Sequence, residues 1–298
     1  MSTFWSNNVQ GPKTLFYSRI AKFSNDKKDI ILQTLKLKSG MKILVVGCGP
    51  GALSIKLSKW LGEETEVIGL DRDKNLIEFA ESKRKEEKLN NIQFIEGDAL
   101  NLPFADNEFD VCLSHTVIEH VPNLNFLVEQ KRVCKAGGKV IVMSVMPNYS
   151  INIESEISKL TQREKELWKP INEAWDKKEK GSDVGKYKIE PREFPFIFKK
   201  AGLINIDIEA LALRVAVDNY TTNRELANII FKSEHEMWME ILENGLNKLN
   251  EKLPPDHIKE LKELINKRDK KRRKMCYEGE KIWDYNVSMV LIGIGYKS

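Results

Sequence analysis

The stretch MKILVVGCGPG at residues 41–51 constrains the fold more strongly than any other part of the chain. A short apolar run leads into three alternating glycines, and residues 52–60 then carry apolar side chains at helical spacing. A buried strand that turns through glycines into a helix N-terminus is how doubly wound α/β folds cradle nucleotide-like ligands. Since turns of ordinary parallel sheets also collect glycines, the motif needs support from the rest of the chain. The three glycines are Gly47, Gly49 and Gly51.

Strand-like and helical stretches alternate from residue 41 to residue 145, which predicts a mostly parallel sheet. We expect an α/β, doubly wound fold with a helical cap over residues 1–40 and a single domain over residues 41–298. Two charged helical stretches interrupt the later strands and are expected as lid insertions at about 148–190 and 216–284. The expected strands are 43–46, 67–70, 92–95, 109–113, 139–145, 203–215 and 286–296.

Two carboxylates follow the second and third expected strands. Asp71 stands twenty residues after Gly51, where a carboxylate accepts both hydroxyls of a ribose lying over the glycine turn. This geometry also suits NAD, and the glycine spacing fits the looser dinucleotide fingerprint. Pro50 argues against NAD because it removes a backbone N–H from the loop that would bind a pyrophosphate. Asp98 could accept a hydrogen bond from the exocyclic amine of an adenine.

Together these motifs resemble the class I S-adenosylmethionine-dependent methyltransferases, in particular the small-molecule branch with the ubiquinone/menaquinone-biosynthesis and sterol enzymes. The resemblance covers about residues 40–146 and rests on VVGCGPG, on Asp71, and on GDALNLPFADNEFDVCLSHTVIEHVPN at 97–123. It implies a Rossmann-like, seven-stranded sheet in the order 3-2-1-4-5-7-6, with strand seven antiparallel. The cofactor would be S-adenosyl-L-methionine.

By matching position, the resemblance also implies roles for individual residues. The three glycines would line the methionine portion of the cofactor, Asp71 would hold its ribose, and Arg72 and Asp98 would contact its adenine. The family usually carries an acid two residues before the first motif glycine, and this chain has Val45 there. The cofactor-binding residues expected on this basis are Gly47, Cys48, Gly49, Gly51, Asp71, Arg72, Asp98, Ala99 and His115.

His115 is the best-placed candidate for a general base, because it comes just past the fourth expected strand, at the sheet edge that faces the cofactor. An imidazole titrates near neutral pH, so this role predicts a rate inflection near pH 6–7. The alternative is that His115 positions the loop before residues 118–121. An anionic or soft acceptor would need no base at all.

Aromatic residues outside the cofactor motifs could contact the methyl acceptor. Trp168 and Trp175 are candidates for an apolar pocket if the first insertion roofs the acceptor site, although aromatic residues at helical spacing also form cores. The N-terminal cap could be a flap over the ligand that carries Tyr17 and Arg19, or it could pack against the sheet edge. We therefore expect methyl transfer to a small, partly apolar metabolite.

Three other functions stay open. An RNA or protein methyltransferase would use the basic run at 269–274, but that run lacks a recognised RNA-binding module and reads most simply as a charged helix end. A non-catalytic cofactor-binding protein is compatible with Val45, and a nicotinamide oxidoreductase would bind NADH. Nucleic acid is therefore not the expected partner.

The composition is that of a soluble globular protein, with 41% hydrophobic and 31% charged residues and a net charge of +4 over 298 residues. The four cysteines lack C-x-x-C spacing, so we expect reduced thiols and no metal site. No apolar run reaches membrane-spanning length and the N-terminus has no signal pattern, which predicts a cytoplasmic protein without membrane insertion.

Overall fold

The computed structural model describes residues 4–178, 184–249 and 253–298. The chain divides into two compact units, which we call the sheet unit and the helical unit. The sheet unit comprises Met1–Ser150, Asp183–Leu213 and Ser288–Ser298, and the helical unit comprises Ile151–Ser182 and Arg214–Val287. The lid role expected for the inserted helical stretches remains a prediction.

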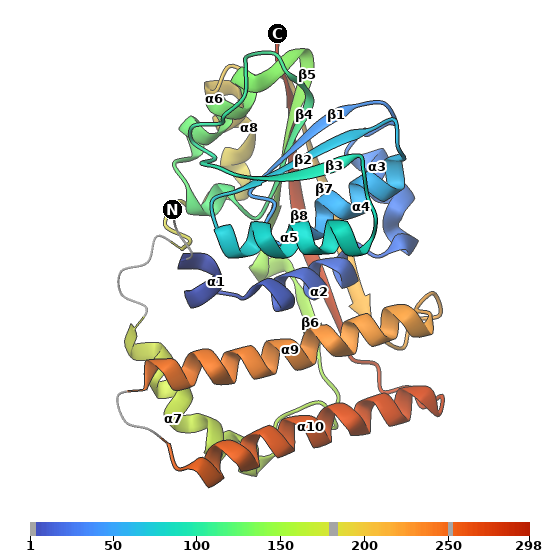
Figure 1. Cartoon of the computed structure of the whole chain (residues 1–298), viewed down its shortest axis with the longest axis vertical. Coiled ribbons are helices and arrows are strands. Elements are labelled where there is room, and N and C mark those ends of the chain that lie inside the picture. The colour runs from blue at the N-terminus through green and yellow to red at the C-terminus, as the bar shows by residue number, and fades with distance from the viewer. Residues whose placement is uncertain (1–3, 179–183, 250–252) are drawn as a thin grey trace. The chain divides into compact units, whose positions relative to one another are not determined.

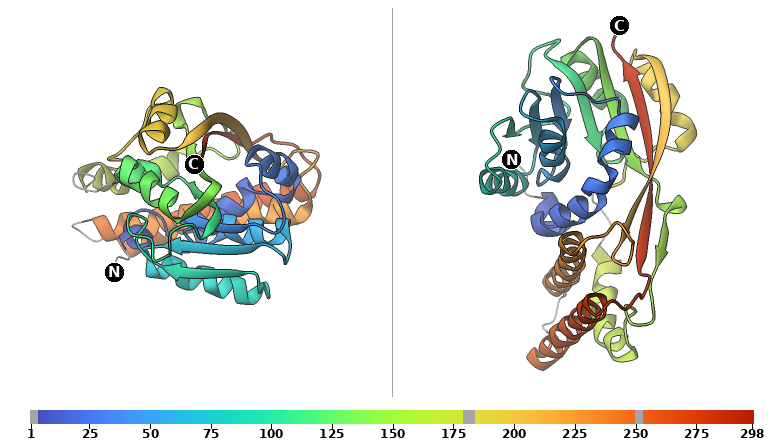
Figure 2. Two further views of the ribbon diagram at one scale, coloured as in Figure 1. Left: turned by 90° about the horizontal axis from the view of Figure 1, so that it is seen from above. Right: turned by 90° about the vertical axis from the view of Figure 1, so that its right-hand side faces the viewer.

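The strands of the sheet unit run in the order β3-β2-β1-β4-β5-β8, and β7 pairs with the outer side of β8. Strands β1 to β5 are parallel, and β8 is antiparallel to β5. Numbering β7 and β8 as strands six and seven gives the predicted order 3-2-1-4-5-7-6, which is confirmed; Figure 2 shows these two long strands side by side. The strands are β1 (Lys42–Val46), β2 (Glu66–Asp71), β3 (Ile92–Glu96), β4 (Phe109–His115), β5 (Cys134–Val145), β7 (Ile204–Ala216) and β8 (Tyr285–Tyr296).

Helices cover both faces of this sheet, which is why its central strands are almost wholly apolar. Helices α4 (Ala52–Leu61) and α5 (Lys74–Glu86) pack against β2 and β3. Helices α6 (Asn123–Val133) and α8 (Phe194–Lys200) pack on the other face, where Phe126 and Phe198 join the core beneath β1 and β4.

The N-terminal helices are α1 (Phe4–Asn8), α2 (Pro12–Lys22) and α3 (Lys28–Thr34). Helix α2 buries an apolar stripe against α4 and α5, and Figure 1 shows α1 and α2 beside α5. The backbone N–H and the hydroxyl of Ser6 both donate to the carboxylate of Asp73, each at 2.9 Å. Asp73 is also the N-cap of α5, so α1 is fastened to the start of that helix.

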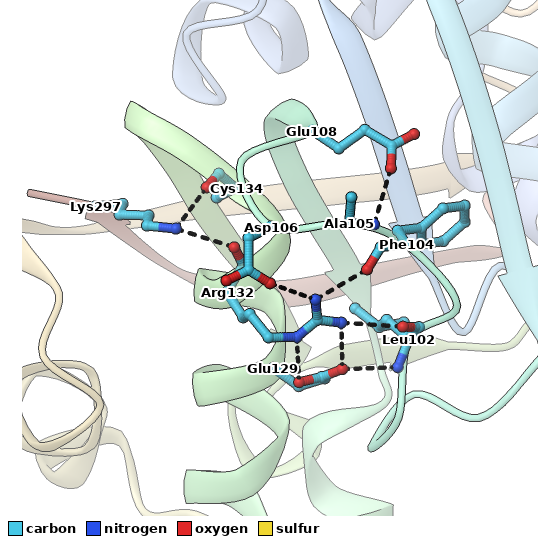
Figure 3. Close-up of polar contacts among 9 residues, drawn as sticks. All are labelled: Leu102, Phe104, Ala105, Asp106, Glu108, Glu129, Arg132, Cys134 and Lys297. Atoms are coloured by element: carbon cyan, nitrogen blue, oxygen red, sulfur yellow. Dashed lines mark hydrogen bonds and ion pairs between the residues drawn. The ribbon is translucent and has the colours of Figure 1, made fainter.

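Arg132 on α6 holds the loop between β3 and β4 (Figure 3). Its guanidinium donates to the backbone carbonyls of Leu102 and Phe104 at 3.0 and 2.9 Å, and to Asp106 at 2.7 Å. Glu129, one helical turn earlier, accepts from Arg132 and from the N–H of Leu102. These charge-assisted hydrogen bonds hold the loop between β3 and β4 against α6.

The start of β5 differs from the prediction. The sequence places the strand at 139–145, after a glycine pair, whereas the observed strand begins at Cys134, directly after α6. Cys134 pairs with Phe109, and the N–H of Gly137 donates to the carbonyl of Lys297, so long-range pairing continues the strand through the glycines.

The helical unit contains helices α7 (Gln162–Lys178), α9 (Arg224–Lys248) and α10 (Pro255–Tyr277), and the short strand β6 (Ile151–Ile153), which pairs with the first residues of β8. The three helices pack together, and α9 and α10 run beside each other in Figure 2. Asn223 caps α9 by accepting from the N–H of Leu226 at 2.9 Å. In the part of the chain that the structure describes, no helix is long and apolar enough to cross a bilayer.

Candidate functional site

The glycine turn lies between β1 and α4, where the chain order of the sheet strands reverses between β1 and β4. All three glycines have positive φ, at 66°, 57° and 82° for Gly47, Gly49 and Gly51. A Cβ on Gly47 would strike Val117, and one on Gly51 would strike the ring of Phe94. A Cβ on Gly49 would meet no atom within 4 Å, so this residue borders open space on the pocket side of the turn.

Asp71 at the end of β2 binds the glycine turn directly. Its Oδ2 accepts from the N–H of Gly49 at 2.8 Å, and its Oδ1 accepts from the N–H of Asp73 at 3.0 Å. Burial raises the pKa of the Asp71 carboxyl, and the two backbone donors oppose that shift. Each oxygen keeps a lone pair for a further donor, so the carboxylate can accept hydroxyl groups from a ligand in the pocket.

The other residues expected to bind the cofactor line the same pocket, which lies wholly within the sheet unit. Cys48 lies beside Asp71, and burial raises the pKa of its thiol well above the usual value. Asp98 follows β3 and uses Oδ1 to accept from the N–H of Leu100 at 2.9 Å. Arg72 is exposed at the rim. The predicted residues that line the pocket are Gly47, Cys48, Gly49, Asp71, Arg72, Asp98, Ala99 and His115; Gly51 is the remaining member and starts α4 beside it.

The N-terminal helices contribute a wall of this pocket. Trp5 on α1 and Leu15 and Arg19 on α2 line it, together with Val117 and Val121 from the segment after β4. The sequence indicates Arg19 only as part of a possible flap, and it gives no role to Trp5 or Leu15. Their contribution depends on how α1 and α2 dock against α5, which no local motif encodes.

His115 ends β4 and lies in the pocket wall with only 8% of its surface exposed. Its Nε2 has no hydrogen-bond partner among the described residues, and its ring meets that of Phe23 edge-on at 5.1 Å. Burial lowers the pKa of His115 well below its usual value, and the positive charges of Arg19 and Lys22 lower it further. The ring is therefore neutral at pH 7 and can accept a proton.

Thr116, next to His115, has a φ of 55°, which is rare for a residue with a branched side chain. Its N–H donates to the carbonyl of Met143 at 2.8 Å, and its hydroxyl donates to the carbonyl of His115 at 2.7 Å. These contacts hold the backbone in a strained conformation at the pocket wall, as is common at functional sites.

His120 lies in the short helical turn Ile118–His120 and also lines the pocket. Its Nδ1 accepts a hydrogen bond from the N–H of Gly185 at 2.9 Å, and its ring meets Trp5 edge-on at 4.8 Å. Burial, together with the charge of Arg72, lowers the pKa of His120 to about 4. His120 thus joins three separate segments of the sheet unit.

Two of the three residues suggested for acceptor binding, Tyr17 and Trp168, do not line this pocket. Tyr17 is absent from the pocket lining and packs edge-on against Phe16 at 5.4 Å. Trp168 is 2% exposed in the core of the helical unit, where it contacts Trp238. The side chain of Trp175 lies outside the described residues. Trp168 is therefore a core residue here, the alternative that helical spacing of aromatic residues also allows.

A doubly wound sheet, a glycine turn at its switch point and carboxylates after β2 and β3 define a protein that binds a nucleoside-containing cofactor. A family model described as a methyltransferase domain matches residues 37–202, more than half of the chain. The chain belongs to this methyltransferase domain family.

Curated relatives match a part of the chain. The demethylmenaquinone methyltransferase of Staphylococcus saprophyticus is 42% identical over 114 residues, which cover 38% of this chain and 48% of the relative. The enzyme of the same name from Bacillus velezensis is 36% identical over 127 residues, 42% of this chain and 54% of the relative. The chain thus spans about half the length of the curated relatives that it matches.

Solved structures share the fold. Phosphoethanolamine N-methyltransferase 2 of Haemonchus contortus, in complex with S-adenosyl-L-methionine, aligns with a TM-score of 0.54 and 18% identity over 100% of this chain and 60% of that one. The YcgJ protein of Bacillus subtilis aligns with a TM-score of 0.50 and 17% identity over 92% of this chain and 100% of that one.

The residues that line the pocket fit S-adenosylmethionine as the cofactor. The open space at Gly49 allows a ligand to approach the backbone, and the spare lone pairs of Asp71 suit ribose hydroxyls. Asp98 adds a second acceptor after the neighbouring strand. When bound, the cofactor supplies an electrophilic methyl group on a sulfonium, while the protein supplies orientation and a pocket that excludes water.

Proposed function

We propose that this protein is an S-adenosylmethionine-dependent methyltransferase. It would transfer the methyl group of the cofactor to a small, partly apolar metabolite bound in the pocket of the sheet unit. The observation that carries the proposal is the wall that α1 and α2 add to that pocket. Trp5 and Leu15 place apolar surface beside Val117 and Val121, so the acceptor must fit inside a bounded space. A pocket with apolar walls of this kind suits a small molecule better than a segment of a macromolecule.

The cofactor roles proposed for single residues follow from their positions. The turn around Gly49 faces the methionine portion, Asp71 accepts from the ribose, and Asp98 accepts from the adenine amine. Arg72 at the rim flanks the adenine. Val45 lines the pocket where the family usually has an acid, so the polar contacts of the loop must come from its backbone.

His115 is proposed as the general base. Its imidazole is neutral at pH 7, its Nε2 has no partner among the described residues, and it faces the same pocket as Asp71. A phenol or an amine acceptor would transfer its proton to this nitrogen as the new bond to carbon forms.

The decisive experiment incubates the purified enzyme with methyl-labelled cofactor and a cell extract, and then separates small molecules from protein and RNA. We expect label in the small-molecule fraction, with none when Gly49→Val is used. Label confined to RNA or protein would refute the small-molecule proposal and leave the methyltransferase activity standing.

A further inference from the structure

Helix α2 carries two cationic side chains on the side of the pocket, Arg19 and Lys22, of which Arg19 lines the pocket itself. Lys22 follows Arg19 on the next turn of the same helix, three residues later. Among the described residues, neither side chain makes a hydrogen bond or an ion pair. The charge of Glu119 acts on Arg19, and the charges of Arg19 and Lys22 both act on His115.

The environment of these side chains makes their positive charge costly. Burial lowers the pKa of Arg19, and it lowers the pKa of Lys22 to about 7, with the charge of Arg19 as the second cause. The carboxyl of Glu119 is itself destabilised as an anion, since burial raises its pKa and its Oε2 has no hydrogen-bond partner in the described ranges of the chain. Glu119 therefore offsets the charge of Arg19 only in part, and Lys22 adds a second positive charge that no carboxylate is seen to offset among the described residues.

We propose that the methyl acceptor carries an anionic group, a carboxylate or an ionised hydroxyl, which Arg19 binds with the support of Lys22. This assignment rests on the proposed function and narrows it to acidic small molecules. The guanidinium offers planar N–H donors that match a carboxylate, and the anion would offset the cost of burying both cations. Val117, Val121 and Leu15 would contact the apolar part of the same molecule.

Matched pairs of small probes test this assignment. Thermal melting is measured with saturating S-adenosylhomocysteine, and each anion is compared with its uncharged amide: benzoate with benzamide, phenylacetate with phenylacetamide, and isobutyrate with isobutyramide. We expect at least one anion to raise the melting temperature while its amide does not. If no anion exceeds its amide, the proposal is wrong.

Variants then locate the anion. Arg19→Met and Lys22→Met should each weaken the binding of that anion about 10–100-fold, the scale for a hydrogen bond to a charged group. Arg19→Lys should retain part of the affinity for that anion. Lys13→Met, which removes an exposed charge from the same helix, is the control and should bind the anion like the wild type.

A second measurement separates the acceptor from the cofactor, which also carries a carboxylate. Affinity for S-adenosylhomocysteine, measured by calorimetry without probe, should change less than about threefold in Arg19→Met. A parallel loss of cofactor affinity would assign the anion to the cofactor and overturn the proposal. If extract labelling shows only macromolecular acceptors while Arg19 still binds the probe anion, the proposed function fails and the anion site remains.

Discussion

The backbone N–H of Gly49 donates a 2.8 Å hydrogen bond to Oδ2 of Asp71, so the carboxylate that ends β2 holds the turn that follows β1. The bond restrains a residue whose φ of 57° only glycine adopts easily. The same carboxylate faces the pocket with lone pairs to spare. Asp71 thus both shapes the turn and offers acceptors to a ligand, and its variants should affect the two roles differently.

Replacing Asp71 tests the ribose assignment. Asp71→Ala should lower the affinity for S-adenosylmethionine by about 1.5–3 kcal/mol, or about 10–150-fold, the scale for hydrogen bonds to a charged group. Asp71→Asn keeps one side-chain oxygen and should lose less affinity for S-adenosylmethionine. Titration calorimetry measures both, with Asp29→Ala on the exposed side of α3 as control. Unchanged affinity in Asp71→Ala would show that the ribose lies elsewhere.

Replacing Gly49 tests the open space beside the turn. Gly49→Val should abolish cofactor binding because its side chain would project into the pocket, while most of the fold persists. Gly62→Val is the matched control, since Gly62 also has a positive φ, 81°, and open space around it, but lies at the far end of α4. Equal loss of cofactor binding in both variants would mean that backbone strain, and not occlusion, is responsible.

Replacing His115 tests the general base. His115→Gln should lower turnover roughly 10²–10⁴-fold with little change in cofactor affinity, since the amide cannot accept the proton. The sequence predicts a rate inflection near pH 6–7, but burial and the nearby cations move this pKa well below 6.5. We therefore expect the wild-type rate to stay level through pH 6.5 and to fall only in more acidic buffer. Full turnover with the wild-type pH profile in His115→Gln would exclude the role.

The pH dependence of stability tests the burial of His120. Its pKa is about 4 in the folded protein and about 6.5 in an unfolded chain, so the unfolded state binds more protons between these values. Stability should be fully present above pH 6.5 and should fall as the pH drops toward 4. His120→Gln should flatten this part of the curve of melting temperature against pH, whereas His235→Gln in the helical unit should not. An unaltered slope in His120→Gln would assign the acid sensitivity to other groups, His115 among them.

The parts of the site that the sequence predicts are those encoded locally. The glycine turn, Asp71 and Asp98 each follow a strand, and the carboxyl ends of parallel strands meet at one sheet edge, so their convergence follows from chain order alone. Arg19 and Tyr17 show where this reasoning stops. They stand two residues apart on α2, about 200° around the helix, so the docking that turns Arg19 into the pocket turns Tyr17 away from it.

Other features depend on contacts between distant segments. The strained Thr116 is held by Met143 of the neighbouring strand, and Arg132 reaches from α6 to the loop after β3. Trp168 could not be assigned from its spacing, because a buried core and an apolar pocket impose the same periodicity. The roles of such residues can be assigned only when the segments that pack against them are known.

The two hydrogen bonds that Ser6 makes to Asp73 bear on the shape of the pocket. Asp73 in turn donates its N–H to Asp71, so one chain of hydrogen bonds joins the first helix to the carboxylate proposed to hold the ribose. Trp5 of the same helix lies in the pocket wall. A displacement of α1 would therefore break the hydrogen bonds of Ser6 to Asp73 and move Trp5 at the same time, so the shape of the pocket is tied to the N-cap of α5.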